Sequence, residues 1–547
     1  MREVNRLMEV GKAKKLGFLA ALSVVVSSIV GIGIFLKNIS VIRNAANGAD
    51  AAGFSGTFSF WSVIIAWVLG AVITFFAALS LAEISTSRSS KAGLSGWSEQ
   101  LGGKHLGRFV RFNQATFYYG ILIGALPFLA VEGLYRAIFI GVNHRDPSVN
   151  ELHFGWIFLG GLIILIAFVA LNLFASKASI GFQYLSLFIK IVPLVVVFII
   201  GVANANRSNI LDQNLANVQN GPLGKDLYDA KFQTPSSKWV SVGGIFTALP
   251  AVFFAFDSYA NVGNIADDVK KPHRTIPLVI VFGIIIASII YIVISIGAGL
   301  TGFGDAAKIL QTLIKGDAAN VKQAREGLAI FMNILISLSA FGVVNALSLT
   351  TIKSNESLIE EGQIMGYRFF QKLNNKTQHS GTLLLMTFSV GVYFLIVGIV
   401  GTALNTDAFS DAITNLPSLF FFLIYAIIIS LGFIDRFTKK QCHRVWGFWF
   451  AAPVSAIAIY AVFIYMFFVN NIIDVAKNPF ANSGSGLFFD NNARPWKNWQ
   501  NMVIFWVLLA TFIFMPLINH LVIMKTGGYI NLDTKYFNNS LKNTKSY

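Results

Sequence analysis

The chain has 547 residues, of which 55% are hydrophobic and only 12% are charged, and its mean hydropathy is +0.64. A soluble domain carries about 25% charged residues, so this composition excludes a soluble protein and indicates an integral membrane protein. The net charge of +16 is explained more simply by basic cytoplasmic loops than by nucleic-acid binding, and we expect no nucleic-acid partner.

Apolar runs of roughly 20 residues, the length that crosses a bilayer core as a helix, recur along the chain. They predict an all-α integral membrane protein with about 12 transmembrane helices. The first six predicted spans are Leu16–Leu36, Phe60–Ala82, Phe112–Tyr135, Phe154–Phe174, Ile180–Val202 and Val242–Gly263. The second six are Ile276–Leu300, Leu328–Thr351, Thr382–Leu404, Pro417–Ile434, Val445–Val469 and Met502–Met524. The longest polar gaps, interpreted as exposed loops, are Ala203–Ser241, Phe303–Gly327 and Asn470–Asn501.

The distribution of basic residues predicts the orientation. The N-terminal segment MREVNRLMEVGKAKK is basic, and the apolar run after it lacks the polar cleavage region of a signal peptide, so we expect the first span to be retained. Twelve spans place both termini on one side, and most of the 42 Lys and Arg residues fall on that side. The positive-inside rule then predicts a multi-pass plasma-membrane protein with both termini in the cytoplasm.

Several kinds of chemistry have no motif in the sequence. It contains no GxxxxGK[ST] phosphate loop and no HExxH zinc motif. Its one cysteine, Cys442, excludes an internal disulfide and a cysteine-based metal site. We therefore expect no enzyme, no cofactor and no metal site, and energy for any transport must come from an ion or solute gradient.

The first span contains the stretch SSIVGIGIFLKNIS, from Ser27 to Ser40, in which serines and glycines interrupt the apolar run. Such weak helix formers allow the helix to open in the middle of the membrane, where freed N–H groups can face an anion and freed C=O groups a cation. The alternative is that Gly31 and Gly33 only allow close helix packing, a common use of glycine in membranes.

The sixth span, within ALPAVFFAFDSYANVGNIADDVKKPHRTIP, is interrupted in the same way. It begins as a lipid-type helix and then places Asp257 and Ser258 at membrane depth, where a carboxylate is costly and usually faces protein or water. The first and sixth spans are equivalent if two five-span halves are related by inversion. Interrupted helices at matching positions of two halves indicate the binding site of a transporter.

These stretches resemble a known family. SSIVGIGIF is similar to the first-helix signature of the amino acid–polyamine–organocation permeases, and FFAFDSYANVGNIADDVKKPHRTIP is similar to their sixth-helix signature. LAEISTSRSSKAGLSGW resembles the stretch after their second helix, although the usual proline and second glycine are missing. The resemblance implies a LeuT-like fold, with five plus five inverted spans and two added helices, and uptake or exchange of amino acids or related amines.

Combined with the predicted spans, the resemblance suggests a division of the chain. The expected parts are a cytoplasmic segment 1–15, a first half 16–202, an extracellular loop 203–241, a second half 242–434, two additional spans within 445–524 and a cytoplasmic tail 525–547.

The resemblance also implies substrate contacts in the first span. Gly31, Ile32 and Gly33 match the family's loop whose backbone N–H groups receive the substrate carboxylate. Ser27 and Ser28 lie just before that loop and either line the pocket or hydrogen-bond their own helix.

In the sixth span, Phe254, Ala255, Phe256 and Asp257 match the unwound part of the family's helix, whose carbonyls meet the substrate amino group. Phe256 matches the position of an aromatic gate, unless it is an ordinary core residue. Asp257 binds a substrate amine, pairs with a lysine or caps the following helix, and we expect the adjacent Ser258 to share the site.

Lys190 lies inside LSLFIKIVPLVVVF, at least nine residues from either end of the fifth span, too deep for its ammonium to reach a headgroup easily. The family's proton-coupled members carry a lysine in an equivalent setting, which implies a role in proton coupling. The alternative is a structural lysine with a permanent partner. In the third span, Tyr118 and Tyr119 reach the pocket or belong to an interfacial aromatic belt.

Together these features predict a secondary transporter of amino acids that works by alternating access, by proton-coupled symport or by exchange. Its partners are then an amino acid, protons and membrane lipid, with the oligomeric state left open. A polyamine or other amine carrier is the nearest alternative. A membrane sensor or scaffold that transports nothing is the alternative of another class.

Overall fold

A computed structural model of the chain describes the helical part of the molecule in detail. The described residues are 17–30, 33, 37–38, 41, 60–86, 93–147, 151, 153–205, 242–260, 269–301, 319–405, 408–440, 442, 444–477, 479–480, 497–526 and 528–529. Gly31, Ile32 and the side chains of Ser27 and Ser28 lie outside this description, as do the N-terminal segment, nearly all of the 203–241 loop and most of the tail.

The described secondary structure is almost entirely helical. The first half contains α2 (Phe18–Ile29), α4 (Phe60–Ile84), α5 (Leu94–Asn113), the π-helix η1 (Gln114–Tyr118), α6 (Tyr119–Asn143), α7 (Phe154–Phe174) and α8 (Ser176–Ala205). The second half contains α11 (Val242–Phe256), α12 (Pro272–Thr301), α14 (Ala319–Glu360), α15 (Tyr367–Lys376), α16 (Ser380–Leu404), α17 (Ala408–Ile413) and α18 (Asn415–Phe437). The last part contains α19 (Phe448–Ile464), the π-helix η5 (Tyr465–Ile473), α20 (Asp474–Lys477) and α21 (Asn498–Lys525).

Ten helical stretches of the described chain are long and apolar enough to cross a membrane. The two remaining predicted spans, the first and the sixth, appear as the shorter helices α2 and α11, so the predicted all-helical membrane fold is confirmed. Two loop predictions were too long. η5 and α20 continue to Lys477, inside the gap expected to be Asn470–Asn501, and α14 begins at Ala319, inside the polar gap that was expected to run to Gly327. The helix there continues beyond its apolar stretch into a charged segment.

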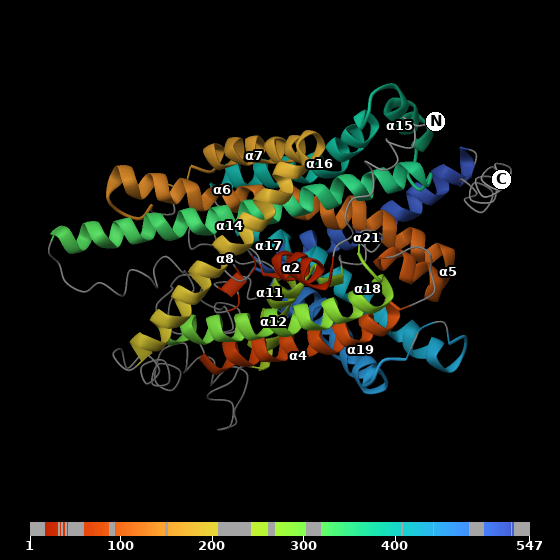
Figure 1. Cartoon of the computed structure of the whole chain (residues 1–547), viewed down its shortest axis with the longest axis horizontal. Coiled ribbons are helices and arrows are strands. Elements are labelled where there is room, and N and C mark those ends of the chain that lie inside the picture. Colours follow the sequence, from red (N-terminus) through yellow and green to blue (C-terminus); the bar gives the residue numbers. More distant parts are fainter. Residues whose placement is uncertain are drawn as a thin grey trace.

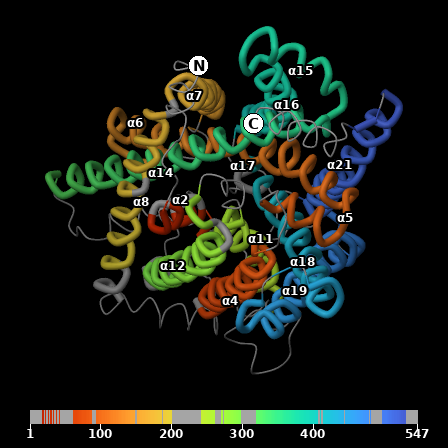
Figure 2. Tube along the Cα trace, turned by 45° about the vertical axis from the view of Figure 1, so that its right-hand side comes forward, coloured from red at the N-terminus to blue at the C-terminus, as the bar shows by residue number. Residues whose placement is uncertain are grey.

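The two short helices explain the odd composition of their segments. α2 has 12 residues and α11 has 15, about 18 Å and 22 Å at 1.5 Å per residue, whereas the hydrocarbon core is about 30 Å thick. Both therefore end inside the membrane. Figures 1 and 2 show them in the middle of the molecule, enclosed by longer helices.

The helix pairings follow the symmetry expected of two equivalent halves. α2 packs on α12, the second helix of the other half, just as α11 packs on α4. The second helices of the halves, α4 and α12, pair with each other, as do the third helices, α6 and α14. α19 packs on α4 and α18 and lies at the edge of the bundle (Figure 2).

The charges of the loops predict which helix ends lie on the same side of the membrane, and two pairs of these ends are in contact. Glu83, at the end of α4, accepts a hydrogen bond of 2.7 Å from the Val445 amide and lies 3.6 Å from the Arg436 guanidinium at the end of α18. Arg111 of α5 pairs with Glu361, just beyond α14. These contacts fix which loops share a side.

Candidate functional site

The break in each short helix has a defined backbone. After α2, Val30 leaves the helical region with ψ of 85°. After α11, the Asp257 backbone amide donates a hydrogen bond of 3.3 Å to the Phe254 carbonyl, which closes a tighter turn than that of an α-helix. Ser258 follows with a positive φ of 75°, which is uncommon for a residue other than glycine. Both helices therefore present the carbonyl groups of their last turn to the centre of the membrane.

One tyrosine links the two breaks. The Tyr291 hydroxyl, on α12, lies 2.6 Å from the Ile29 carbonyl and 2.9 Å from the Ala255 carbonyl. Its ring is fully buried and packs against Trp67 and Phe256, with ring centroids 5.5 and 5.0 Å away. Because a phenol has one proton to donate, the two carbonyls share it, and the last turns of α2 and α11 are held at a fixed separation.

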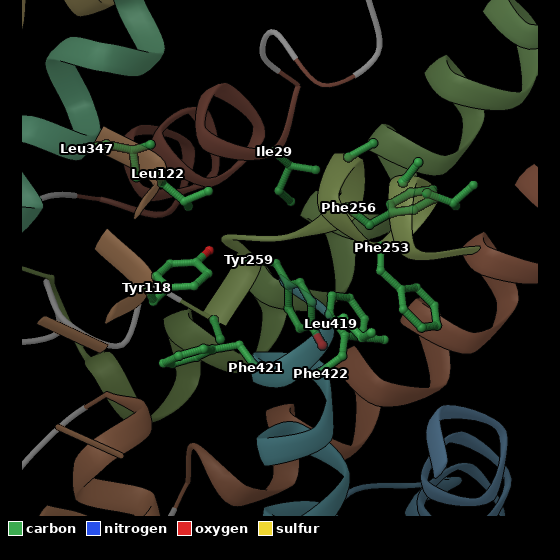
Figure 3. Packing of buried hydrophobic residues seen from close by; sticks show 14 of the residues in the cluster. Ile29, Tyr118, Leu122, Phe253, Phe256, Tyr259, Leu347, Leu419, Phe421 and Phe422 are labelled. Atoms are coloured by element: carbon green, nitrogen blue, oxygen red, sulfur yellow. The ribbon is translucent and has the colours of Figure 1, made fainter. Parts of the chain in front are cut away.

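A cavity lies beside the breaks, and we call it the central cavity. Its empty volume is about 360 Å³, and its lining is mainly apolar. Figure 3 shows Ile29, Leu122 and Leu347 grouped on one side of this region, with the Tyr118 ring opposite them. The lining residues come from five different spans: Ile29, Gly33, Tyr118, Leu122, Leu126, Phe254, Ala255, Asp257, Ser258, Val343, Leu347 and Ser418.

Asp257 is the acidic residue among the described lining residues of this cavity, and it is held by hydrogen bonds. Its carboxylate accepts from the Tyr118 hydroxyl at 2.8 Å, the Tyr425 hydroxyl at 3.2 Å and the Ser258 amide at 2.7 Å. The side chain is 4% exposed. These contacts fix the broken turn and tie it to η1 and α18.

Tyr118 reaches Asp257 because the third span is irregular at this point. Residues 114–118 form the π-helical turn η1 between α5 and α6, and such single turns are frequent at functional sites because they re-aim the side chains that follow. The same hydroxyl lies 3.4 Å from the Ser258 hydroxyl. Tyr118 is therefore a residue of the cavity and not of an interfacial belt.

The residues singled out in the sixth span divide into two groups. Phe254, Ala255, Asp257 and Ser258 line the central cavity. Phe256 is absent from that lining, and its buried ring instead contacts Trp67, at 6.2 Å between centroids, and Tyr291. The aromatic side chain that the sixth span places at the cavity is thus Phe254, two residues earlier.

In the first span, Gly33 lines the cavity and contacts the sixth. A Cβ atom added to Gly33 would lie 3.0 Å from the Ala255 Cα and 3.6 Å from a ring carbon of Phe254. Four residues later, the buried Lys37 donates a 2.9 Å bond to the Thr414 hydroxyl and lies 4.6 Å above the Phe254 ring. Phe254 is thus held between the central cavity and a buried cation.

Lys190 lies midway along α8 and is 1% exposed. A Cβ on Gly342 of α14 would lie 3.7 Å from the Lys190 Cε, so the side chain points into the bundle. Its neighbours Phe188 and Ile191 are exposed on the outer face of the helix. Lys190 does not line the central cavity, and its stem packs against α14 at Gly342.

Sequence reasoning missed the contributions of α12, α14 and α18. Tyr291 and Tyr425 are the single tyrosines of two largely apolar spans, and a polar group at that depth indicates a buried partner. That signal exists, but it does not identify the partner. Leu122, Leu126, Val343 and Leu347 look like any lipid-facing or core residue and carry no local signal.

Comparison with known proteins gives a consistent family match. The sequence model of a family described as amino acid permease matches residues 16–489. An uncharacterized protein of Mycoplasma pneumoniae is 24% identical over 82% of this chain and 84% of its own length. The serine/threonine exchanger SteT of Bacillus subtilis is 24% identical over 52% of this chain and 54% of its own length. The crystal structure of a mutant manganese transporter of Eremococcus coleocola covers 93% of this chain and 96% of its own, with 10% identity and a TM-score of 0.48.

Proposed function

The chain belongs to the amino acid permease family, and we propose that it carries a small amino acid across the membrane through the central cavity by alternating access. Members of this family are permeases and not enzymes. The single observation that supports the site is a cavity at the point where two short helices end inside the membrane.

The chemistry of the breaks suits a zwitterion. Helix C-termini carry partial negative charge, so the last turns of α2 and α11 attract the substrate ammonium group. The backbone of Gly31, Ile32 and Gly33 would offer N–H groups to the carboxylate, with Ser27 and Ser28 beside it. Asp257 and Ser258 shape the turn, and Phe254 covers the cavity, the role first expected of Phe256.

The lining favours a small and uncharged substrate side chain. Eight of the twelve described lining residues are glycine or carry apolar side chains, so little of the wall can stabilise a charged side chain. Asp257 already accepts three hydrogen bonds, which leaves little capacity for a second substrate amine and disfavours a polyamine. The similarity to a serine/threonine exchanger supports the same class.

Counterflow in proteoliposomes tests this function. Liposomes preloaded with unlabelled serine should take up external labelled serine faster than protein-free liposomes, and preloaded putrescine should not replace serine. Binding of serine in a thermal-shift assay without any exchange would instead identify a sensor. Exchange driven by putrescine would identify an amine carrier.

We further propose proton coupling through Lys190. A buried lysine at mid-membrane is rare and usually functional, and this side chain faces α14, a wall of the central cavity. A change in its protonation would alter the packing of α8 against α14 and so favour one of the two access states.

We expect the 203–241 loop to be extracellular and the two termini cytoplasmic. Ser236→Cys should react with an impermeant maleimide in whole cells, whereas Lys372→Cys, at an exposed position of α15, should react only after permeabilisation. Labelling of Lys372→Cys alone in intact cells would reverse the proposed orientation.

The native cysteine should not disturb that measurement. Burial, together with the charges of Asp435 and Glu83, raises the pKa of the Cys442 thiol to about 12. Since only the thiolate reacts, alkylation of Cys442 at pH 7 should be roughly a hundredfold slower or more than that of a cysteine of ordinary pKa. Wild-type protein, permeabilised and treated with maleimide, checks this by mass spectrometry, and rapid modification would contradict it.

Tyr291→Phe should weaken serine binding by roughly tenfold without unfolding the protein. The change keeps the ring between Trp67 and Phe256 but leaves two buried carbonyls without their shared donor. That loss costs about 1–3 kcal/mol and destabilises the arrangement of the two helix breaks at the cavity. Tyr135→Phe is the matched control, because Tyr135 also donates to a backbone carbonyl, that of Glu151, at 2.9 Å. Equal effects of the two changes on binding, measured by isothermal titration, would contradict the role given to Tyr291.

A further inference from the structure

A second cavity lies between α5 and α21, and we call it the α5–α21 cavity. Its empty volume is about 710 Å³, and it shares no lining residue with the central cavity. We propose that it binds one anionic phospholipid from the leaflet on the side of the membrane where α21 ends.

The polar and apolar parts of this cavity lie at different depths. Along α21, His520 lies five residues before the terminal Lys525, Leu517 lies eight before it and Ile513 twelve. At 1.5 Å per residue these are about 7, 12 and 18 Å from the end of the helix. The headgroup region of one leaflet is about 5–7 Å thick, so His520 is at headgroup depth and the two apolar residues are at acyl-chain depth.

The apolar wall is open to lipid. Ile513 and Leu517 line the cavity and are 46% and 48% exposed. Their neighbours Phe514 and Ile518 are similarly exposed on the same transmembrane helix. An acyl chain that follows this face of α21 can therefore enter the cavity sideways, whereas a soluble anion would gain nothing from that wall.

The polar end is basic and ordered. His105, Arg108 and His520 line it, and no acidic residue is among the lining residues that the structure describes. The Arg108 guanidinium stacks 3.6 Å from the Tyr529 ring centroid, and the Tyr529 hydroxyl lies 2.7 Å from His520 Nδ1. None of the ion pairs between described residues involves Arg108. A stacked guanidinium keeps its N–H donors at the ring edge, so Arg108 is positioned to bind a phosphate, as basic pockets between membrane helices do.

Native mass spectrometry of the delipidated, full-length protein tests the proposal. Phosphatidylglycerol should bind about tenfold more tightly than phosphatidylcholine with the same chains, and Arg108→Gln should remove that preference, which corresponds to the loss of one charge-assisted hydrogen bond. His520→Gln provides a second test if Arg108→Gln does not fold. Lys440→Gln, an exposed cation beyond α18, should keep the preference.

Three outcomes would overturn the site. They are equal binding of the two lipids by the wild type, an unchanged preference in the folded Arg108→Gln and His520→Gln variants, and an equal loss in Lys440→Gln. Millimolar inorganic phosphate should not displace phosphatidylglycerol, because it cannot use the apolar wall. Displacement would assign the cavity to a soluble anion instead.

Discussion

Gly33→Val is expected to reduce serine binding by about a hundredfold or more while the protein still inserts and folds. A Cβ at this position already lies 3.0 Å from the Ala255 Cα, and that neighbour is backbone, which cannot rotate away. The two further methyl groups of valine would push the first and sixth spans apart at the cavity. Overpacking a tight contact costs about 1–3 kcal/mol, and about 2.7 kcal/mol borne by the bound state corresponds to a hundredfold loss of affinity. Isothermal titration with serine measures the loss, and circular dichroism and size-exclusion chromatography measure the fold.

A graded series separates this effect from general damage to a membrane helix. Gly33→Ala should give an intermediate loss, since its single methyl group needs only a few tenths of an ångström of adjustment. Gly181→Val in α8 is the matched control, because no heavy atom lies within 4 Å of a Cβ placed there, and it should bind serine normally. If Gly33→Val binds as tightly as the wild type, Gly33 serves helix packing alone and the substrate site lies elsewhere.

Lys190→Met is expected to abolish accumulation driven by a pH gradient. A gradient of one pH unit supplies about 1.4 kcal/mol per proton and therefore supports about tenfold accumulation by one-proton symport. Methionine keeps an apolar stem of similar length against Gly342 but cannot bind a proton. Uptake of labelled serine into proteoliposomes with an imposed gradient should fall to the level without a gradient.

Two further measurements separate a loss of proton coupling from a loss of the substrate site or of the fold. Counterflow exchange by Lys190→Met, with no gradient, should persist if the lysine couples the proton without forming the substrate site. Lys177→Met changes an exposed lysine of the same helix and should respond to the gradient like the wild type. Gradient-driven accumulation by Lys190→Met at the wild-type level would make Lys190 a structural residue, and the protein would couple elsewhere or act as an exchanger.

The interruption of the two helices could be predicted because its causes are local. The glycines near Gly31 and the polar residues after Phe256 weaken a helix wherever it lies, so their positions in the chain indicated where α2 and α11 would end. The depth of Lys190 followed in the same way from counting residues. In each case the feature that decides the structure, the length of an apolar run or a weak helix former, lies within one short stretch of sequence.

Which side chains meet at the site depended on tertiary structure. Phe254 and Phe256 are chemically identical and two residues apart, and only the rotation of α11 against α4 and α12 turns the first to the cavity and the second to Trp67. The same rotation, with the π-helical turn η1, brings Tyr118 to Asp257.

The sequence by itself determined that this chain is a helical membrane protein, where its spans lie and that the first and the sixth are broken, since apolar length and helix propensity act within some twenty residues. The tertiary structure decided that Tyr291 joins the two breaks and that Tyr425, 168 positions from Asp257, holds its carboxylate. Such contacts join residues far apart in the chain, and their formation depends on the angle and rotation of whole helices, which no local pattern specifies.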